Sequence, residues 1–199
     1  MFIDQKLSDF LEAVAAKTPT PGGGSVAATV GALGAALGVM VARYSEAADA
    51  EAALDEVKNA FLPLVDQDAE AYGQVNSARM LPKGTDEERR RRKEALQNAL
   101  AEASEAPLKG MGLAVRGLQA LAELAPRCNR YLASDLAGAA YCLEAALAGC
   151  GENVRVNAAA LLDKDRRKRL QDEQARLREE GAALKARLVR ELEVPHARK

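Results

Sequence analysis

The chain has 199 residues and 48% of them are hydrophobic, which is enough apolar material for one domain with a substantial core and argues against disorder. Its formal net charge of −1 gives no overall attraction to nucleic acid or to an anionic membrane. The single histidine, His196, lies among the last few residues, so we expect neither a histidine-based triad nor a metal site built on histidines. Acid–base chemistry must then use carboxylates, lysines, tyrosines or water.

Cysteine usage indicates the compartment. The three cysteines form no C-x-x-C pair: Cys128, Cys142 and Cys150. The first ten residues lack the basic and apolar regions of a secretory signal. The expectation is therefore free thiols in a reducing cytoplasm.

Helix-forming residues dominate the first part of the chain, and no sustained alternation predicts a strand. Apolar residues from Leu7 to Val14 recur at helical spacing and predict a first amphipathic helix, which the loop "TPTPGGGS" follows. A second helix is expected from about Ser25 to Tyr44. Its uncharged stretch could be mistaken for a membrane span, but its alanine and glycine content and its small residues four apart predict a fully buried central helix.

The helices in the middle of the chain are longer. A third helix should run from about Asp49 to Met80 and bend at Pro63. Thr85 begins a capping box, which predicts the start of a fourth helix. That helix should bend or break near Pro107 and end before Pro126.

Two more helices complete the prediction. The fifth should begin near Ser134, a plausible N-cap, and run toward Leu162. The last, from about Asp163 to Glu193, is highly charged. The basic runs Arg89–Lys93 and Arg166–Arg169 are interspersed with acids and lack aromatic residues, which is typical of solvated faces rather than of a nucleic-acid site. With no repeat and no long linker, we expect residues 1–199 to form one all-α multihelical bundle.

The third predicted helix carries an apolar stripe that one carboxylate interrupts. The stripe consists of Leu54, Val57, Phe61, Leu64, Tyr72 and Val75. Asp68 lies four residues from both Leu64 and Tyr72, so it takes an apolar position, whereas Asp66 lies about 200° around the helix and should point nearer to solvent. A buried carboxylate is costly unless it is paired or protonated. Asp68 is therefore either a structural residue that caps a loop or pairs with an arginine, or a functional acid or base.

A second set of polar residues lies along the fifth predicted helix. Asp135 and Asn153 share a face if one helix connects them, about 27 Å apart, and Asn157 lies one turn further on. These side chains could meet different parts of a long ligand or a partner subunit. On spacing alone, capping by Asp135 and helix–helix hydrogen bonds from the asparagines are the favoured interpretation.

The proline–glycine loop matches neither a P-loop nor a dinucleotide motif, because no Lys-Ser or Lys-Thr follows it and no strand precedes it. Its glycines permit close approach of a ligand and positive φ angles, and the helix that follows offers N–H groups to an anion. A tight corner between two helices is the simpler reading of the same residues.

Four segments together resemble one family: "TPTPGGGSVAA", "DQDAEAY" followed by "ARMLPK", "SDLAGAA", and "NVRVN". From about Leu7 to Leu162 the chain is similar to the cyclodeaminase/cyclohydrolase family of tetrahydrofolate enzymes. The resemblance implies an all-α homodimer that binds folate near the subunit interface, with a tetrahydrofolate derivative as substrate and no metal or redox cofactor. It also implies a catalytic acid in the D-x-D stretch, Asp66 or Asp68, of which the stripe favours Asp68.

On this resemblance the loop forms a wall of the folate pocket. The candidate substrate-binding residues are Pro21, Gly22, Gly23, Gly24, Ser25, Lys83, Asp135, Asn153 and Asn157. The anionic glutamate tail of folate could meet Lys17, Lys83 or an arginine, and the residues do not distinguish these.

The function expected from the sequence is formimidoyltetrahydrofolate cyclodeaminase or 5,10-methenyltetrahydrofolate cyclohydrolase activity, with acid–base catalysis by a buried aspartate. The alternative is a non-catalytic folate-binding protein or helical scaffold dimer. We expect a homodimer, no nucleic-acid partner and no membrane. A narrow leucine stripe in the last helix adds to the dimer expectation, because one subunit need not bury it; it consists of Leu170, Leu177, Leu184, Leu188 and Leu192.

Overall fold

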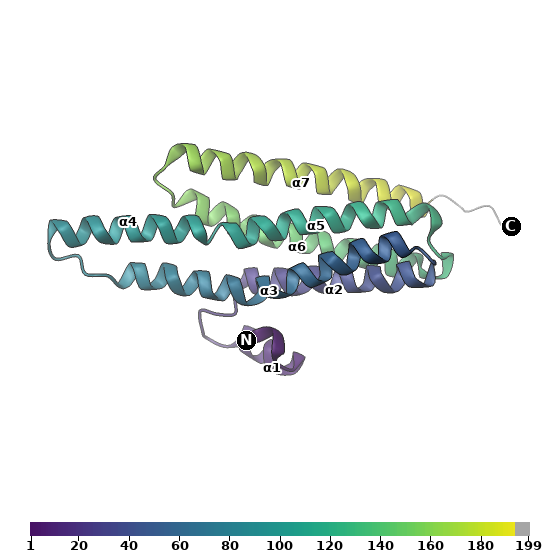
Figure 1. Ribbon diagram of the computed structural model, residues 1–199, viewed down its shortest axis with the longest axis horizontal. Helices are drawn as coiled ribbons and strands as arrows, with labels where there is room; N and C mark the ends of the chain where they lie inside the picture. Colours follow the sequence, from purple (N-terminus) through teal and green to yellow (C-terminus); the bar gives the residue numbers. More distant parts are fainter. Residues whose placement is uncertain (194–199) are drawn as a thin grey trace.

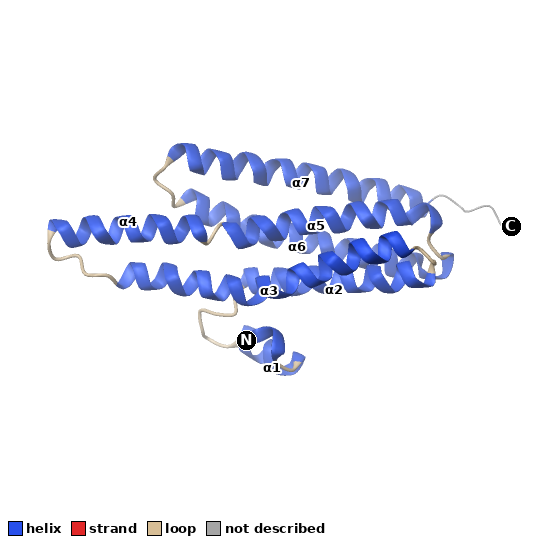
Figure 2. Cartoon of the chain, in the orientation of Figure 1, coloured by secondary structure: helices blue, strands red, loops and turns tan. Residues whose placement is uncertain are grey.

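The structure, a computed structural model, describes residues 1–193; His196 lies outside them. Figure 1 shows an elongated bundle of long helices, with the short N-terminal helices set off at one side. Within residues 1–193 there are helices and loops and no strand, which confirms the all-α prediction (Figure 2). The elements are η1 (Phe2–Asp4), α1 (Leu7–Ala15), α2 (Gly23–Tyr44), α3 (Ala48–Met80), α4 (Asp86–Glu102), α5 (Glu105–Leu124), η2 (Ala125–Arg127), η3 (Arg130–Leu132), α6 (Ala133–Ala159) and α7 (Lys164–Glu193).

Helix α2 is the central helix, and it packs most extensively against α3 and α6. Its small residues permit this close packing: a β-carbon at Gly31 would lie 2.5 Å from the Phe61 ring, and one at Gly34 would lie 2.8 Å from Cβ of Cys142. With a mean hydropathy of 1.9, α2 is long and apolar enough to span a membrane, but 61% of that stretch is buried inside the bundle. The helix is therefore central, but the prediction that it is fully buried was wrong, because one face that includes Leu33 lies outside the packed core.

The predicted fourth helix is divided into α4 and α5 at Ala103 and Ser104. A proline ring clashes with the carbonyl of the residue four positions earlier, and for Pro107 that residue is Ala103. The chain therefore leaves the helix there and begins again, with Pro107 in the first turn of α5, where its missing N–H costs nothing. The capping box of α4 is confirmed: Glu88 N donates to Thr85 Oγ1 at 3.2 Å, and Thr85 N donates to Glu88 Oε2 at 2.9 Å.

The fifth predicted helix, α6, does not begin with Ser134 as its N-cap, so that prediction was wrong. The N-cap is Leu132, because the short helix η3 leads directly into α6. Asn129 caps η3 instead, with its side-chain oxygen accepting from Tyr131 N at 3.1 Å. Helix α3 passes through Pro63 without interruption.

The leucine stripe of α7 is covered within one subunit. Leu170, Leu177 and Leu188 are buried, and Leu184 and Leu192 pack partly buried against the same core. The stripe therefore gives no reason for a dimer.

Candidate functional site

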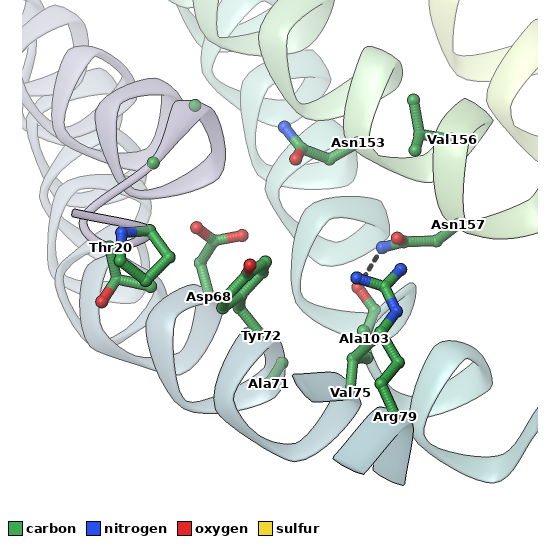
Figure 3. A pocket seen from close by; sticks show the side chains of 13 residues that line it. Thr20, Asp68, Ala71, Tyr72, Val75, Arg79, Ala103, Asn153, Val156 and Asn157 are labelled. Carbon is green, nitrogen blue, oxygen red and sulfur yellow. Dashed lines mark hydrogen bonds between the residues drawn. The ribbon is translucent and has the colours of Figure 1, made fainter. Parts of the chain in front are cut away.

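Four parts of the chain surround a cavity of about 300 Å³: the loop before α2, one face of α3, the α4–α5 break and the last turns of α6 (Figure 3). Its lining consists of Pro19, Thr20, Gly22, Gly23, Asp68, Ala71, Tyr72, Val75, Arg79, Ala103, Asn153, Val156 and Asn157. Asp68 is the one carboxylate and Arg79 the one cation among these described residues. The cavity is therefore part apolar, with one charge of each sign.

Asp68 binds the first turn of α2. Ser25 N donates to Asp68 Oδ2 at 3.0 Å, and Ser25 Oγ lies 3.2 Å from the same oxygen. The N-cap position of α2 is Gly22, which has no side chain to cap the helix. Asp68 reaches across from α3 and supplies the acceptor that an Asp or Ser N-cap would supply locally. Of the two alternatives left open by the sequence, the capping contact is thus present, and the carboxyl also faces the cavity.

Position 24 requires a glycine because the Asp68 carboxyl lies close to its backbone. A β-carbon there would lie 2.0 Å from Asp68 Oδ1, whereas one at Gly23 would meet nothing nearer than Asn153 Nδ2 at 3.8 Å. No described glycine has a positive φ, so the glycines of this loop do not use the positive φ angles that they permit. The physical reason for glycine is that the Asp68 carboxyl occupies the space of a side chain.

Burial raises the pKa of the Asp68 carboxyl, and the hydrogen bonds from the Ser25 N–H and hydroxyl act in the opposite direction without cancelling it. The Ser25 hydroxyl has only one hydrogen, and Val65 O lies 2.8 Å from it, closer than Asp68. Donation to Asp68 therefore competes with donation to Val65. Nearby, burial raises the pKa of the Cys150 thiol to about 12, and the charge of Asp68 adds to this. Cys150 is therefore a protonated thiol and no nucleophile.

Both asparagines of α6 line the opposite wall. Asn153 Nδ2 donates to Gly149 O at 3.0 Å within its own helix. Asn157 Nδ2 donates at 2.9 Å to Ala103 O, the carbonyl that the Pro107 break removes from the α4 ladder. Within the described chain neither amide oxygen accepts a hydrogen bond from protein, so both are available to a ligand in the cavity.

Some predicted site residues lie elsewhere. Pro21 is buried next to residues that line the cavity. Gly24 and Ser25 contact the Asp68 carboxyl and do not line the cavity themselves. Lys83 is exposed in the α3–α4 loop, and Asp135 lies in the first turn of α6, about 27 Å from Asn153. Neither lines the cavity: Lys83 lies beyond the end of α3, and the α6 face shared by Asp135 and Asn153 extends over several helical turns.

Asp66 faces away from the cavity. Phe2 N donates to its Oδ1 at 2.6 Å, and its Oδ2 is buried without a hydrogen-bond partner in the described chain. The prediction that Asp66 points nearer to solvent was wrong, because η1 covers that side of α3.

Sequence reasoning missed Arg79 and the backbone at Ala103. A signal for Arg79 was present, since Tyr72, Val75 and Arg79 follow Asp68 by four, seven and eleven residues and so continue the same helix face. The contribution of Ala103 depends on a helix break and on a contact with α6, and no local pattern marks it.

The geometry can be compared with known proteins. The model of the formiminotransferase-cyclodeaminase family matches residues 6–176. The formimidoyltransferase-cyclodeaminase of Rattus norvegicus is 39% identical over 172 residues, which are 81% of this chain and 32% of that protein. The chain thus spans about a third of the length of that relative. The methenyltetrahydrofolate cyclohydrolase of Methylorubrum extorquens is 33% identical over 90% of this chain and 92% of its own.

A solved structure has the same fold over nearly the whole chain. It is the formiminotetrahydrofolate cyclodeaminase of Thermotoga maritima, with 29% identity and a TM-score of 0.85 over 96% of each chain.

Proposed function

Because the chain belongs to the formiminotransferase-cyclodeaminase family, we propose that it is an enzyme that acts on a one-carbon derivative of tetrahydrofolate in this cavity. The observation that carries the proposal is the half-buried Asp68 carboxyl, which faces the cavity with a raised pKa. A carboxyl that titrates closer to neutrality than an exposed one can both accept and donate a proton during turnover. The capping contact with Ser25 uses Oδ2 and does not require that the carboxyl also face a cavity.

The first candidate reaction is cyclodeamination of 5-formimidoyltetrahydrofolate, which the solved relative's name favours. The N10 nitrogen attacks the carbon of the protonated formimidoyl group, N5–CH=NH₂⁺, and the N10 proton passes to the Asp68 carboxylate. The resulting tetrahedral carbon carries an amino group. Asp68 returns the proton to that nitrogen, the carbon–nitrogen bond breaks, and ammonia leaves with the methenyl bridge formed. One residue thus performs both transfers, and no proton is left over at the site.

The second candidate is hydrolysis of 5,10-methenyltetrahydrofolate, which the relative from Methylorubrum extorquens favours because it matches over nearly its whole length. Water adds to the bridging carbon and gives a proton to Asp68. The bond from that carbon to one of its two nitrogens then breaks as Asp68 protonates that nitrogen, and the hydroxyl group releases its proton to solvent to become the formyl carbonyl. The amide oxygen of Asn153, which lies across from Gly23 at the Asp68 end of the cavity, would orient the water.

Assays of the purified protein with both substrates test the proposal. We expect turnover of at least one, detected by formation or loss of the methenyl chromophore. Binding of tetrahydrofolate without turnover of either substrate would instead support the non-catalytic folate-binding alternative.

We further propose that the protein is a cytoplasmic homodimer, with an outward face of α2 in the interface. Leu33 and Tyr44 are 58% and 67% exposed, and Leu37 and Met40 between them are only half-buried. These residues continue one helix face at spacings of three and four, so they form an apolar strip that one subunit leaves in water. Light scattering should give twice the monomer mass at micromolar concentration, and Leu33→Glu should shift it toward the monomer. A monomeric wild type would contradict the proposal.

A further inference from the structure

The cavity is elongated along α3, and its two ends carry different charges. Asp68 lies at one end, Tyr72 and Val75 follow on the same face, and Arg79 lies at the other end. The two charged residues are eleven positions apart, so their Cα atoms are separated by about 16 Å along the helix axis. Helical side chains tilt toward the helix N-terminus, which brings the long Arg79 side chain closer to Asp68. A ligand that meets both ends must be elongated, with an aromatic or apolar middle.

The Arg79 guanidinium is free to bind an anion. Within the described chain it forms no ion pair, although arginines elsewhere on the surface pair with neighbouring acids, as Arg116 does with Glu56 and Arg127 with Asp49. Figure 3 shows the side chain extending toward Asn157 beside the α4–α5 break. Its backbone carbonyl accepts from Arg92 Nε at 3.0 Å, which anchors the last turn of α3 to α4. The cation is thus held on a fixed backbone and directed at the cavity.

We infer that Arg79 is the specificity-determining residue that binds the carboxylate of the glutamate moiety, and so fixes which end of the substrate meets Asp68. The inference rests on the proposed function. A guanidinium binds a carboxylate through two parallel N–H···O bonds, an arrangement that a lysine does not provide. Tyr72 and Val75 then lie against the p-aminobenzoyl ring, and the one-carbon bridge is left beside Asp68. Lys83, the alternative cation near this end of α3, does not line the cavity.

The test compares two ligands that differ in the anionic glutamate. Binding of tetrahydrofolate and of the neutral methylamide of tetrahydropteroate (hereafter the pteroate) is measured first, and then the kinetics of their 5,10-methenyl derivatives. Because a hydrogen bond to a charged group is involved, the wild type should bind the folate about 10–100-fold more tightly than the pteroate. Arg79→Gln should remove this preference: KM for the folate rises by about the same factor, kcat is unchanged, and values for the pteroate stay as in the wild type.

Variants of neighbouring cations are the controls. Arg79→Lys should restore part of the preference, because it keeps the charge without the fork. Lys83→Gln and Arg91→Gln, which alter exposed cations outside the cavity, should keep the full preference. A loss of preference in Lys83→Gln with none in Arg79→Gln would overturn the assignment.

The outcomes separate this inference from the proposed function. Turnover with equal affinity for folate and pteroate would overturn the role of Arg79 and leave the function intact. A glutamate preference that depends on Arg79, without turnover of either substrate, would support Arg79 and contradict catalysis. No binding of tetrahydrofolate would contradict both.

Discussion

Asp66 and Asp68 are separated by one residue on α3, and they meet different parts of the molecule. Asp68 faces a cavity and holds the first turn of α2 through Ser25. Asp66 faces the other side of the helix, where Phe2 donates to it and η1 covers it. Both carboxyls are half-buried. Burial alone therefore does not distinguish a catalytic carboxyl from a structural one; what distinguishes them is whether the carboxyl also faces space for a ligand.

The largest expected effect separates the two carboxyls by catalysis. Asp68→Asn removes the titratable proton but keeps an oxygen that can accept from Ser25 N, so turnover should fall by about 10²–10⁴-fold with little loss of tetrahydrofolate affinity. Asn caps a helix about as well as Asp, so Tm should change little. Steady-state kinetics and thermal unfolding check both. A fully active variant with a sharply lowered Tm would make Asp68 only an anchor for α2.

A substitution beneath Asp68 should have the next largest effect. The added methyl of Gly24→Ala would lie 2.0 Å from Asp68 Oδ1, so the carboxyl must move. We expect a loss in rate on the order of 10²-fold and a loss of about 1–3 kcal/mol in unfolding free energy. Gly73→Ala is the matched control, because a β-carbon there meets nothing within 4 Å. Equal behaviour of the two variants would mean that the first turn of α2 adapts freely.

Ser25→Ala should shift the titration of Asp68 rather than abolish activity. The Ser25 hydroxyl is one of the groups that lower the pKa of Asp68, so its loss should raise that pKa further. If turnover begins with ionised Asp68, the acidic limb of the pH–rate profile moves to higher pH. Ser104→Ala is the control, since Ser104 is equally buried and its hydroxyl donates to Leu100 O. A profile identical to that of the wild type would show that the hydroxyl stays on Val65.

Asp66→Asn should have the smallest effect. The variant loses a charge that accepts from Phe2 N, but the buried group without a partner becomes a neutral amide instead of part of a charged carboxylate, which is less costly to bury. These contributions oppose each other, so the unfolding free energy should change by no more than about 1 kcal/mol, and turnover should stay close to wild type. Chemical denaturation beside the activity assay measures both. An inactive, stably folded variant would reverse the assignment of the two carboxyls.

Local patterns predicted the features that arise from local physics. The position of Asp68 followed from the periodicity of one helix, and Pro107 placed the α4–α5 break to within a few residues, because its clash reaches only four positions back. Contacts between distant segments could not be predicted in this way. The cover over Asp66 comes from Phe2, 64 residues earlier. Asp135 does not line the cavity of this chain, because the face that it shares with Asn153 extends over about 27 Å.

The contact between Asp68 and Ser25 couples the protonation state of Asp68 to local opening of the first turn of α2. Ionised Asp68 places a negative charge at the positive end of the α2 dipole, an interaction typically worth about 0.3–1 kcal/mol, and protonation removes it. The first turn of α2 is thus held most firmly when the carboxyl is ready to accept a proton, and less firmly once it carries one. Gly22 and Gly23 form the cavity wall at that turn, so this part of the wall is also held more firmly when Asp68 is ionised than when it is protonated. Amide hydrogen exchange at Ser25 would record it as opening that increases when Asp68 is protonated.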